Sequence, residues 1–80
     1  GADGIWGLQR GFKKAGANSI IMSLWKVDDE ACYRLFDKFY QYLLIEKKDV
    51  RQSFISAQKD LRNDPKFESV NHWASFILID

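Results

Sequence analysis

Two short segments, Ser19–Trp25 and Trp73–Ile79, constrain the fold most, because each carries apolar residues on both of its alternating sets of positions. In the first segment, Ile20 and Met22 alternate with Ile21. A strand with this pattern is typical of the centre of an α/β sheet, where both faces are covered. Two strands cannot complete such a sheet, so we expect partner strands from elsewhere.

The composition predicts a folded segment of a single small domain. The chain has 80 residues, of which 46% are hydrophobic and 15% aromatic, values that argue against disorder. Its one cysteine excludes an internal disulfide bond, and no Cys/His cluster suggests a metal site. We therefore expect no metal and no cofactor, and we treat residues 1–80 as one partial domain.

The charge balance gives no reason to expect a nucleic acid or a membrane as partner. Twelve basic and eleven acidic residues leave a net charge of +1. No apolar run approaches the ~18 residues of a membrane span, and the first residues do not resemble a signal peptide. We expect a cytoplasmic protein.

Three segments have the periodicity of amphipathic helices. Ile5–Ala15 places apolar residues on one face, and Asp29–Ile45 does so most clearly. Asp28 is the expected N-cap of the second helix, and Asp49 that of a third, Asp49–Arg62, with Gln52 three residues later as in a capping box.

The expected order is therefore helix, strand, helix, helix, strand. One helix after a strand returns the chain to the level at which the strand began, and a second helix carries it forward again. We therefore expect the last strand to run antiparallel to the first. The loop 63–71 could span about 30 Å if extended, which leaves a parallel arrangement open.

Neither of the residues that could form a thiol–imidazole pair is expected to be catalytic. Cys32 lies on the apolar stripe of a helix, where a cysteine is usually an inert small hydrophobe. His72 follows a polar loop at the expected start of the last strand, where a solvated or hydrogen-bonded histidine is the ordinary case. We assign no catalytic residue within the chain.

The stretch after the first strand, Trp25 followed by Asp28 and Asp29, allows two interpretations. Acidic residues there are what any helix start carries, and capping alone explains them. However, sites in open α/β sheets form beyond the carboxyl ends of strands. An aromatic wall beside carboxylates suits a basic side chain, through ring contact and charge pairing.

Several stretches together resemble the C-terminal part of the CHAT domain, a caspase-like peptidase family related to separase and often attached to tetratricopeptide repeats. They are GLQRGFKKAGA, SLWKVDDEA and WASFILI. The resemblance covers nearly the whole chain and implies a caspase-like three-layer α/β fold, with a mostly parallel sheet and helices on both faces. Lys26 stands where many relatives have proline or another residue.

The resemblance implies that the catalytic His and Cys lie upstream and that Cys32 matches neither. It makes Trp25 and Asp29, with Asp28 second, substrate-binding residues for a basic residue before the cleaved bond. We therefore expect the recognition and scaffold portion of a CHAT-type cysteine endopeptidase, inactive on its own. The alternative is a non-catalytic interaction module with the same fold. The isolated chain is also expected to form a homodimer through an unpaired strand edge.

Overall fold

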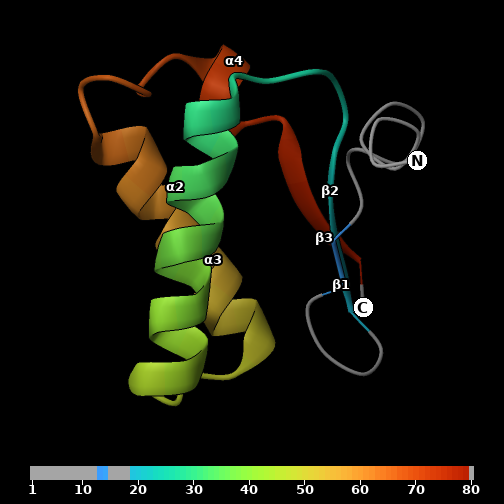
Figure 1. Ribbon diagram of the computed structural model, residues 1–80, viewed down its shortest axis with the longest axis vertical. Helices are drawn as coiled ribbons and strands as arrows, with labels where there is room; N and C mark the ends of the chain where they lie inside the picture. Colours follow the sequence, from blue (N-terminus) through green and yellow to red (C-terminus); the bar gives the residue numbers. More distant parts are fainter. Residues whose placement is uncertain (1–12, 15–18, 80) are drawn as a thin grey trace.

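The computed structural model describes residues 13–14 and 19–79, in which three strands form one antiparallel sheet (Figure 1). The strands are β1 (Lys13–Lys14), β2 (Ile20–Ser23) and β3 (Phe76–Ile79), in the order β1-β2-β3. β2 pairs with β3 from Ile20 opposite Ile79 to Ser23 opposite Phe76. The antiparallel direction expected for the last strand is confirmed. The parallel pairs implied for the whole domain are not among these described strands.

Four helical segments of the described chain lie between β2 and β3. After β2 come α2 (Asp29–Tyr40), its π-helical continuation η1 (Gln41–Ile45), α3 (Val50–Asn63) and the short α4 (Val70–Trp73), and β3 follows. The mixed α/β class and both long helices are confirmed.

Three boundaries differ from the sequence-based expectation. The first predicted strand, Ser19–Trp25, is shorter and spans Ile20–Ser23. Residues 5–12 and Ala15 of the first predicted helix lie outside the described residues, but Lys13–Lys14 form β1. Backbone pairing with Ile20 and Ile21 takes the place of helical hydrogen bonds there. Trp73 belongs to α4 and not to the last strand, because the Ser69 hydroxyl accepts a bond from the Asn71 N–H at 3.2 Å and starts a helical turn.

Side-chain caps fix the starts of the two long helices. The carboxylate of Asp28 accepts a hydrogen bond from the Glu30 N–H at 2.9 Å, and that of Asp49 accepts from the Gln52 N–H at 2.7 Å. Each cap satisfies a backbone donor that has no partner inside the helix. Both expected N-caps are thus confirmed.

The continuation of α2 is wider than an ordinary α-helix. Over η1 the helix is π-helical, and at its end the Glu46 N–H donates to the Gln41 carbonyl at 3.1 Å. The chain then turns at Lys47, whose φ of 60° is in the left-handed region. A non-glycine residue there is strained, because its Cβ crowds the backbone.

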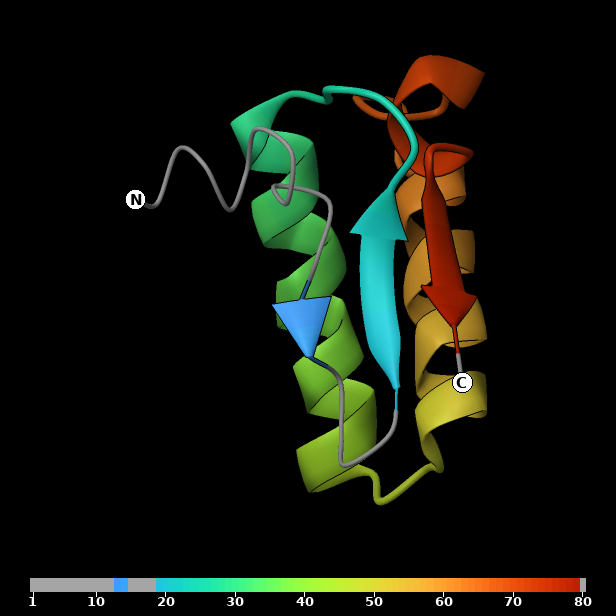
Figure 2. The ribbon, with the colours of Figure 1, turned by 90° about the vertical axis from the view of Figure 1, so that its right-hand side faces the viewer.

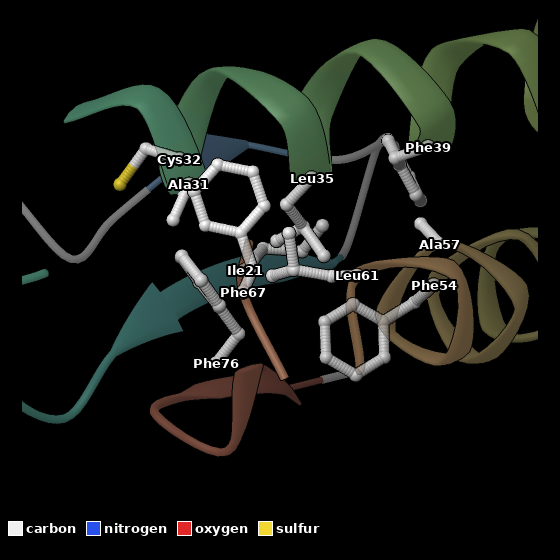
Figure 3. Close-up of a cluster of buried hydrophobic side chains, with 10 residues drawn as sticks. All are labelled: Ile21, Ala31, Cys32, Leu35, Phe39, Phe54, Ala57, Leu61, Phe67 and Phe76. Atoms are coloured by element: carbon white, nitrogen blue, oxygen red, sulfur yellow. The ribbon is translucent and has the colours of Figure 1, made fainter. Parts of the chain in front are cut away.

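Both long helices lie on the same side of the sheet (Figure 2). Between these two layers lies a core of ten buried side chains that come from α2, α3, the following loop and the two longer strands (Figure 3). They are Ile21, Ala31, Cys32, Leu35, Phe39, Phe54, Ala57, Leu61, Phe67 and Phe76. Of the sheet, Ile21 and Phe76 point into this core, and Leu78 packs against it.

The opposite face of the sheet is apolar as well. By the alternation of strand residues, Ile20 and Met22 of β2 point away from the helices, as do their partners Ile79 and Ile77 of β3. Ile79 is 45% exposed, and the other three are half-buried. No described helix covers this face (Figure 2). Among the described residues, therefore, the helices cover only one of the two apolar faces of the sheet.

A polar contact ties η1 to α3. The hydroxyl of Tyr42 donates a hydrogen bond to the carboxylate of Asp60. This bond, together with partial burial and the negative charges of Asp60 and Glu46, raises the pKa of Tyr42 to about 12. Tyr42 therefore keeps its proton well above the pH at which an exposed tyrosine loses it.

Within the part of the chain that the structure describes, no helix has the length and apolar character needed to cross a membrane.

Candidate functional site

Trp25 lies immediately beyond β2, where the strand gives way to a loop. The strand ends with the Leu24 N–H donating to the Ser75 carbonyl at 2.9 Å. The indole Nε1–H of Trp25 then donates to the Asn71 carbonyl at 3.0 Å, which fixes the ring against α4. The side chain is still 42% exposed. An indole that is both held in place and open to solvent is suited to contact another molecule.

The three acidic residues after this tryptophan have different partners. Asp28 is committed to capping α2, as described above. Glu30 forms a salt bridge with Lys66, with 2.6 Å between the carboxylate oxygen and Nζ. Asp29 is exposed, and no side chain of the described residues is paired with its carboxylate. Of the three carboxylates, that of Asp29 is the one left to meet a ligand.

The arrangement suits a cationic group. The exposed face of a tryptophan attracts ammonium and guanidinium groups, and a carboxylate forms charge-assisted hydrogen bonds with them. Trp25 lies in the connection that follows the carboxyl end of β2, and Asp29 is the first residue of α2, at the other end of this connection.

Cys32 and His72, the residues that could form a thiol–imidazole pair, lie in different surroundings. Cys32 is buried in the core, where its thiol is inaccessible to a substrate. His72 lies in α4, not at the start of a strand, and its ring meets Phe67 edge-on with 5.5 Å between the centroids. Its Nδ1 is buried and has no hydrogen-bond partner among the described residues.

Two features of this region could not be deduced from residue types. The Trp25 indole is held by a backbone carbonyl, that of Asn71, which any residue offers. The salt bridge of Glu30 comes from Lys66, which lies in a loop 36 positions further along the chain. Among residues 13–14 and 19–79, no group of three His, Cys, Asp or Glu side chains is placed to hold a metal ion.

Comparison with known proteins identifies the family. The family model of the CHAT domain matches residues 1–80, the whole chain. The chain belongs to the CHAT domain family. The match extends the resemblance seen in GLQRGFKKAGA, SLWKVDDEA and WASFILI to every part of the sequence. This CHAT segment thus comes from a family associated with caspase-like peptidases.

Curated relatives agree with this assignment. The CHAT segment is 35% identical over 78 residues to tetratricopeptide repeat protein 28 from Homo sapiens, and equally to the protein of that name from Mus musculus. The alignments cover 98% of this chain but only 3% of each relative. The names of these relatives agree with the expected attachment to tetratricopeptide repeats. No solved structure matches the chain significantly.

Proposed function

We propose that this CHAT segment is the substrate-recognition and scaffold portion of a caspase-like cysteine endopeptidase domain. In this proposal the upstream part of the domain supplies the cysteine that attacks the peptide carbonyl and the histidine that moves the proton. The segment itself binds the residue before the cleaved bond, which is basic. The supporting observation is that Asp29 remains unpaired among the described residues while Asp28 and Glu30 are both engaged.

Recognition would use two contacts on one side chain of the substrate. The guanidinium or ammonium group pairs with the carboxylate of Asp29, and the aliphatic stem or the cation lies against the indole of Trp25. The bond from Trp25 to the Asn71 carbonyl keeps the indole in place before the substrate arrives. A ring that is already ordered costs less conformational entropy to use in binding.

The test is a pair of substitutions in the intact parent domain. Asp29→Asn removes the charge with little change of size. It should lower kcat/KM for a substrate with a basic residue by roughly 10–100-fold, the scale of a lost charge-assisted contact of ~1.5–3 kcal/mol. A matched substrate with a neutral residue should lose less than about threefold. Asp28→Asn is the control, because asparagine caps helices as well as aspartate does.

Two outcomes would contradict the proposal. Equal losses on both substrates would mean that Asp29 only supports the start of α2. Equal effects of Asp28→Asn and Asp29→Asn on the basic substrate would mean that the cluster acts as a diffuse negative charge, without a defined contact. Trp25→Phe provides a second measurement, because it keeps an aromatic ring but loses the bond to Asn71, and it should raise KM for the basic substrate.

A second candidate function is a non-catalytic interaction module with the same fold. The observation that favours it is the apolar outer face of the sheet, formed by Ile20, Met22, Ile77 and Ile79. In an enzyme this face would meet the upstream part of the same domain, and in an interaction module it could meet a partner protein. The sequence preceding Gly1 in the parent discriminates the two, because the enzyme requires a cysteine there and a histidine further back.

A further inference from the structure

A hollow between α3 and α4 is not used by the function proposed above. It is lined by Ile55, Gln58, Lys59 and Arg62 of α3 and by Trp73 of α4, and its volume is about 150 Å³. The four α3 residues follow the i, i+3, i+4, i+7 spacing that puts them on one face of the helix. α4 lies at the same end of the molecule as the C-terminal end of α3 (Figure 1), so the hollow is formed where the two helices meet.

The floor of the hollow is apolar and held in place by hydrogen bonds. Ile55 is 47% exposed, although it lies on a helix that has a well-filled core on its other side. The indole of Trp73 is fixed by a bond from its Nε1–H to the Glu68 carbonyl at 2.9 Å. An apolar cavity of about this volume can hold a benzene ring, so the hollow has room for one leucine-sized side chain.

Gln58 fixes the geometry of the hollow. Its side-chain nitrogen donates to the carbonyls of Trp73 at 2.7 Å and of Phe76 at 3.0 Å. These two bonds join α3 to α4 and to the start of β3, and they use both N–H groups of the amide. The amide oxygen is the part of this side chain left to accept a bond from a ligand.

The rim of the hollow is positively charged. Both Lys59 and Arg62 line it, and no acidic residue does. Neither forms an ion pair with any of the described residues, whereas Arg34 pairs with Asp64 and Lys66 with Glu30. The Arg62 guanidinium lies over the Trp73 ring, 5.5 Å from its centroid. A stacked guanidinium keeps its N–H groups free at the edge, where they can bind a carboxylate in bidentate fashion.

We propose that this hollow is a docking site for an acidic peptide segment of another protein. One apolar side chain of that segment enters between Ile55 and Trp73, and flanking carboxylates bind Lys59 and Arg62. Charge complementarity decides the kind of partner, because two unpaired cations around an apolar floor exclude a basic segment and favour an acidic one. This inference uses none of the residues of the proposed substrate site and does not depend on it.

A titration of the full chain, labelled with nitrogen-15, tests the proposal. The probe is a blocked peptide of sequence Glu-Glu-Leu-Glu-Glu, and the readout is the indole N–H resonance of Trp73. The resonance should move in a saturable way, and raising the salt concentration from 50 to 300 mM should weaken the apparent affinity several-fold. Replacing the four glutamates by glutamine, or the leucine by glycine, should each weaken it at least about fivefold.

Two double variants with equal net charge separate the site from general electrostatic attraction. Lys59→Gln with Arg62→Gln should weaken binding of the acidic peptide at least tenfold. Lys38→Gln with Lys48→Gln removes the same charge elsewhere on the surface and should change the affinity less than twofold. All four side chains are solvent-facing or near the surface, so both variants should fold, which the dispersion of their amide spectra would verify.

Three results would overturn the proposal. The first is equal weakening by the two double variants, which would show attraction by overall charge only. The second is equally tight binding of a Lys-Lys-Leu-Lys-Lys peptide, or of the glutamine peptide, which would show that the carboxylates are not recognised. The third is the absence of any saturable shift of the Trp73 resonance at millimolar acidic peptide.

Discussion

Because of the hydrogen bond between Tyr42 and Asp60, we expect the free energy of unfolding of this chain to fall at alkaline pH. Tyr42→Phe removes the hydroxyl and keeps the ring. A hydrogen bond to a charged group is worth ~1.5–3 kcal/mol. Because Tyr42 is only half-buried, solvent screens part of that energy. We expect the substitution to lower the free energy of unfolding by about 1–2 kcal/mol at pH 7.

The sign of the pH dependence follows from the direction of the pKa change. Folding raises the pKa of Tyr42 from 10.0 to about 12, so the folded protein binds the phenolic proton more tightly than the unfolded chain does. The resulting stabilisation is fully present below pH 10 and is lost as the pH rises through about 12. The difference between the wild-type chain and Tyr42→Phe should therefore be constant from pH 7 to 9 and shrink above pH 10.

Urea denaturation followed by far-ultraviolet circular dichroism measures this difference at each pH. Tyr33→Phe is the matched control, because Tyr33 is 70% exposed, and its effect should stay within about 0.5 kcal/mol at every pH. The reasoning would be refuted by a Tyr42→Phe effect that does not change between pH 7 and 11.5. It would also be refuted if the effect persisted undiminished in an Asp60→Ala background, since the two changes remove one shared interaction.

Four further outcomes can be checked. Lys47→Gly should raise the free energy of unfolding by roughly 0.5–1 kcal/mol in the same denaturation assay, because glycine adopts the left-handed conformation of this turn without strain, and Lys48→Gly should not. Phe39→Ala should lower it by roughly 3–5 kcal/mol, enough to leave much of the chain unfolded in circular dichroism spectra, since this ring is fully buried between the helices. The chain alone should not hydrolyse peptides with basic residues in a fluorogenic assay, and turnover that Cys32→Ala abolishes would contradict this. Sedimentation equilibrium at micromolar concentration should show a dimer, because β3 lies at an edge of the sheet, and a monomer at all concentrations would contradict that expectation.

Local signals in the sequence were enough to predict the helices. Asp28 and Asp49 are strong capping residues, and the apolar spacing of the two long helices matches the faces that are buried. These signals act over a few residues and so do not depend on the rest of the fold. The antiparallel direction of the last strand followed from the number of helices between the strands.

Predictions failed where distant contacts decide the structure. Phe67 lies in a segment that reads as a polar loop, yet it is 1% exposed. The turn that buries it is closed by the Phe67 N–H, which donates to the Asp64 carbonyl at 2.8 Å. Lys13–Lys14 were predicted as the end of a helix, and pairing with β2 makes them a strand. Phe67 packs in the core against side chains of other elements, and β1 pairs with β2, so in both cases a tertiary contact outweighs a weak local preference.

The candidate site was predictable in part for the same reason. The run from Trp25 to Glu30 drew attention by residue type, and the sequence alone left open whether Asp28 or Asp29 faces a ligand. The hydrogen bond between Asp28 and Glu30 engages Asp28 and so favours Asp29 as the residue that faces a ligand. Residue types alone do not predict this bond, because it depends on the geometry of the helix start. The sequence did not predict the hollow beside Trp73, because its lining residues are common on helix surfaces. They form a hollow only when α4 packs against α3.

The pairing of β2 with β3 also has a consequence for the order in which this chain folds. Residues that face each other in the two strands are more than 50 positions apart, whereas α2 and α3 are joined by a short connection. The helical hairpin can close early, but the pairing of β2 with β3 must wait until β3 has been made. At roughly 5–20 residues per second, a ribosome releases β3 about 3–10 s after β2. During that interval the apolar residues of β2 lack the cover of β3, so newly made chains should depend on chaperones that shield them.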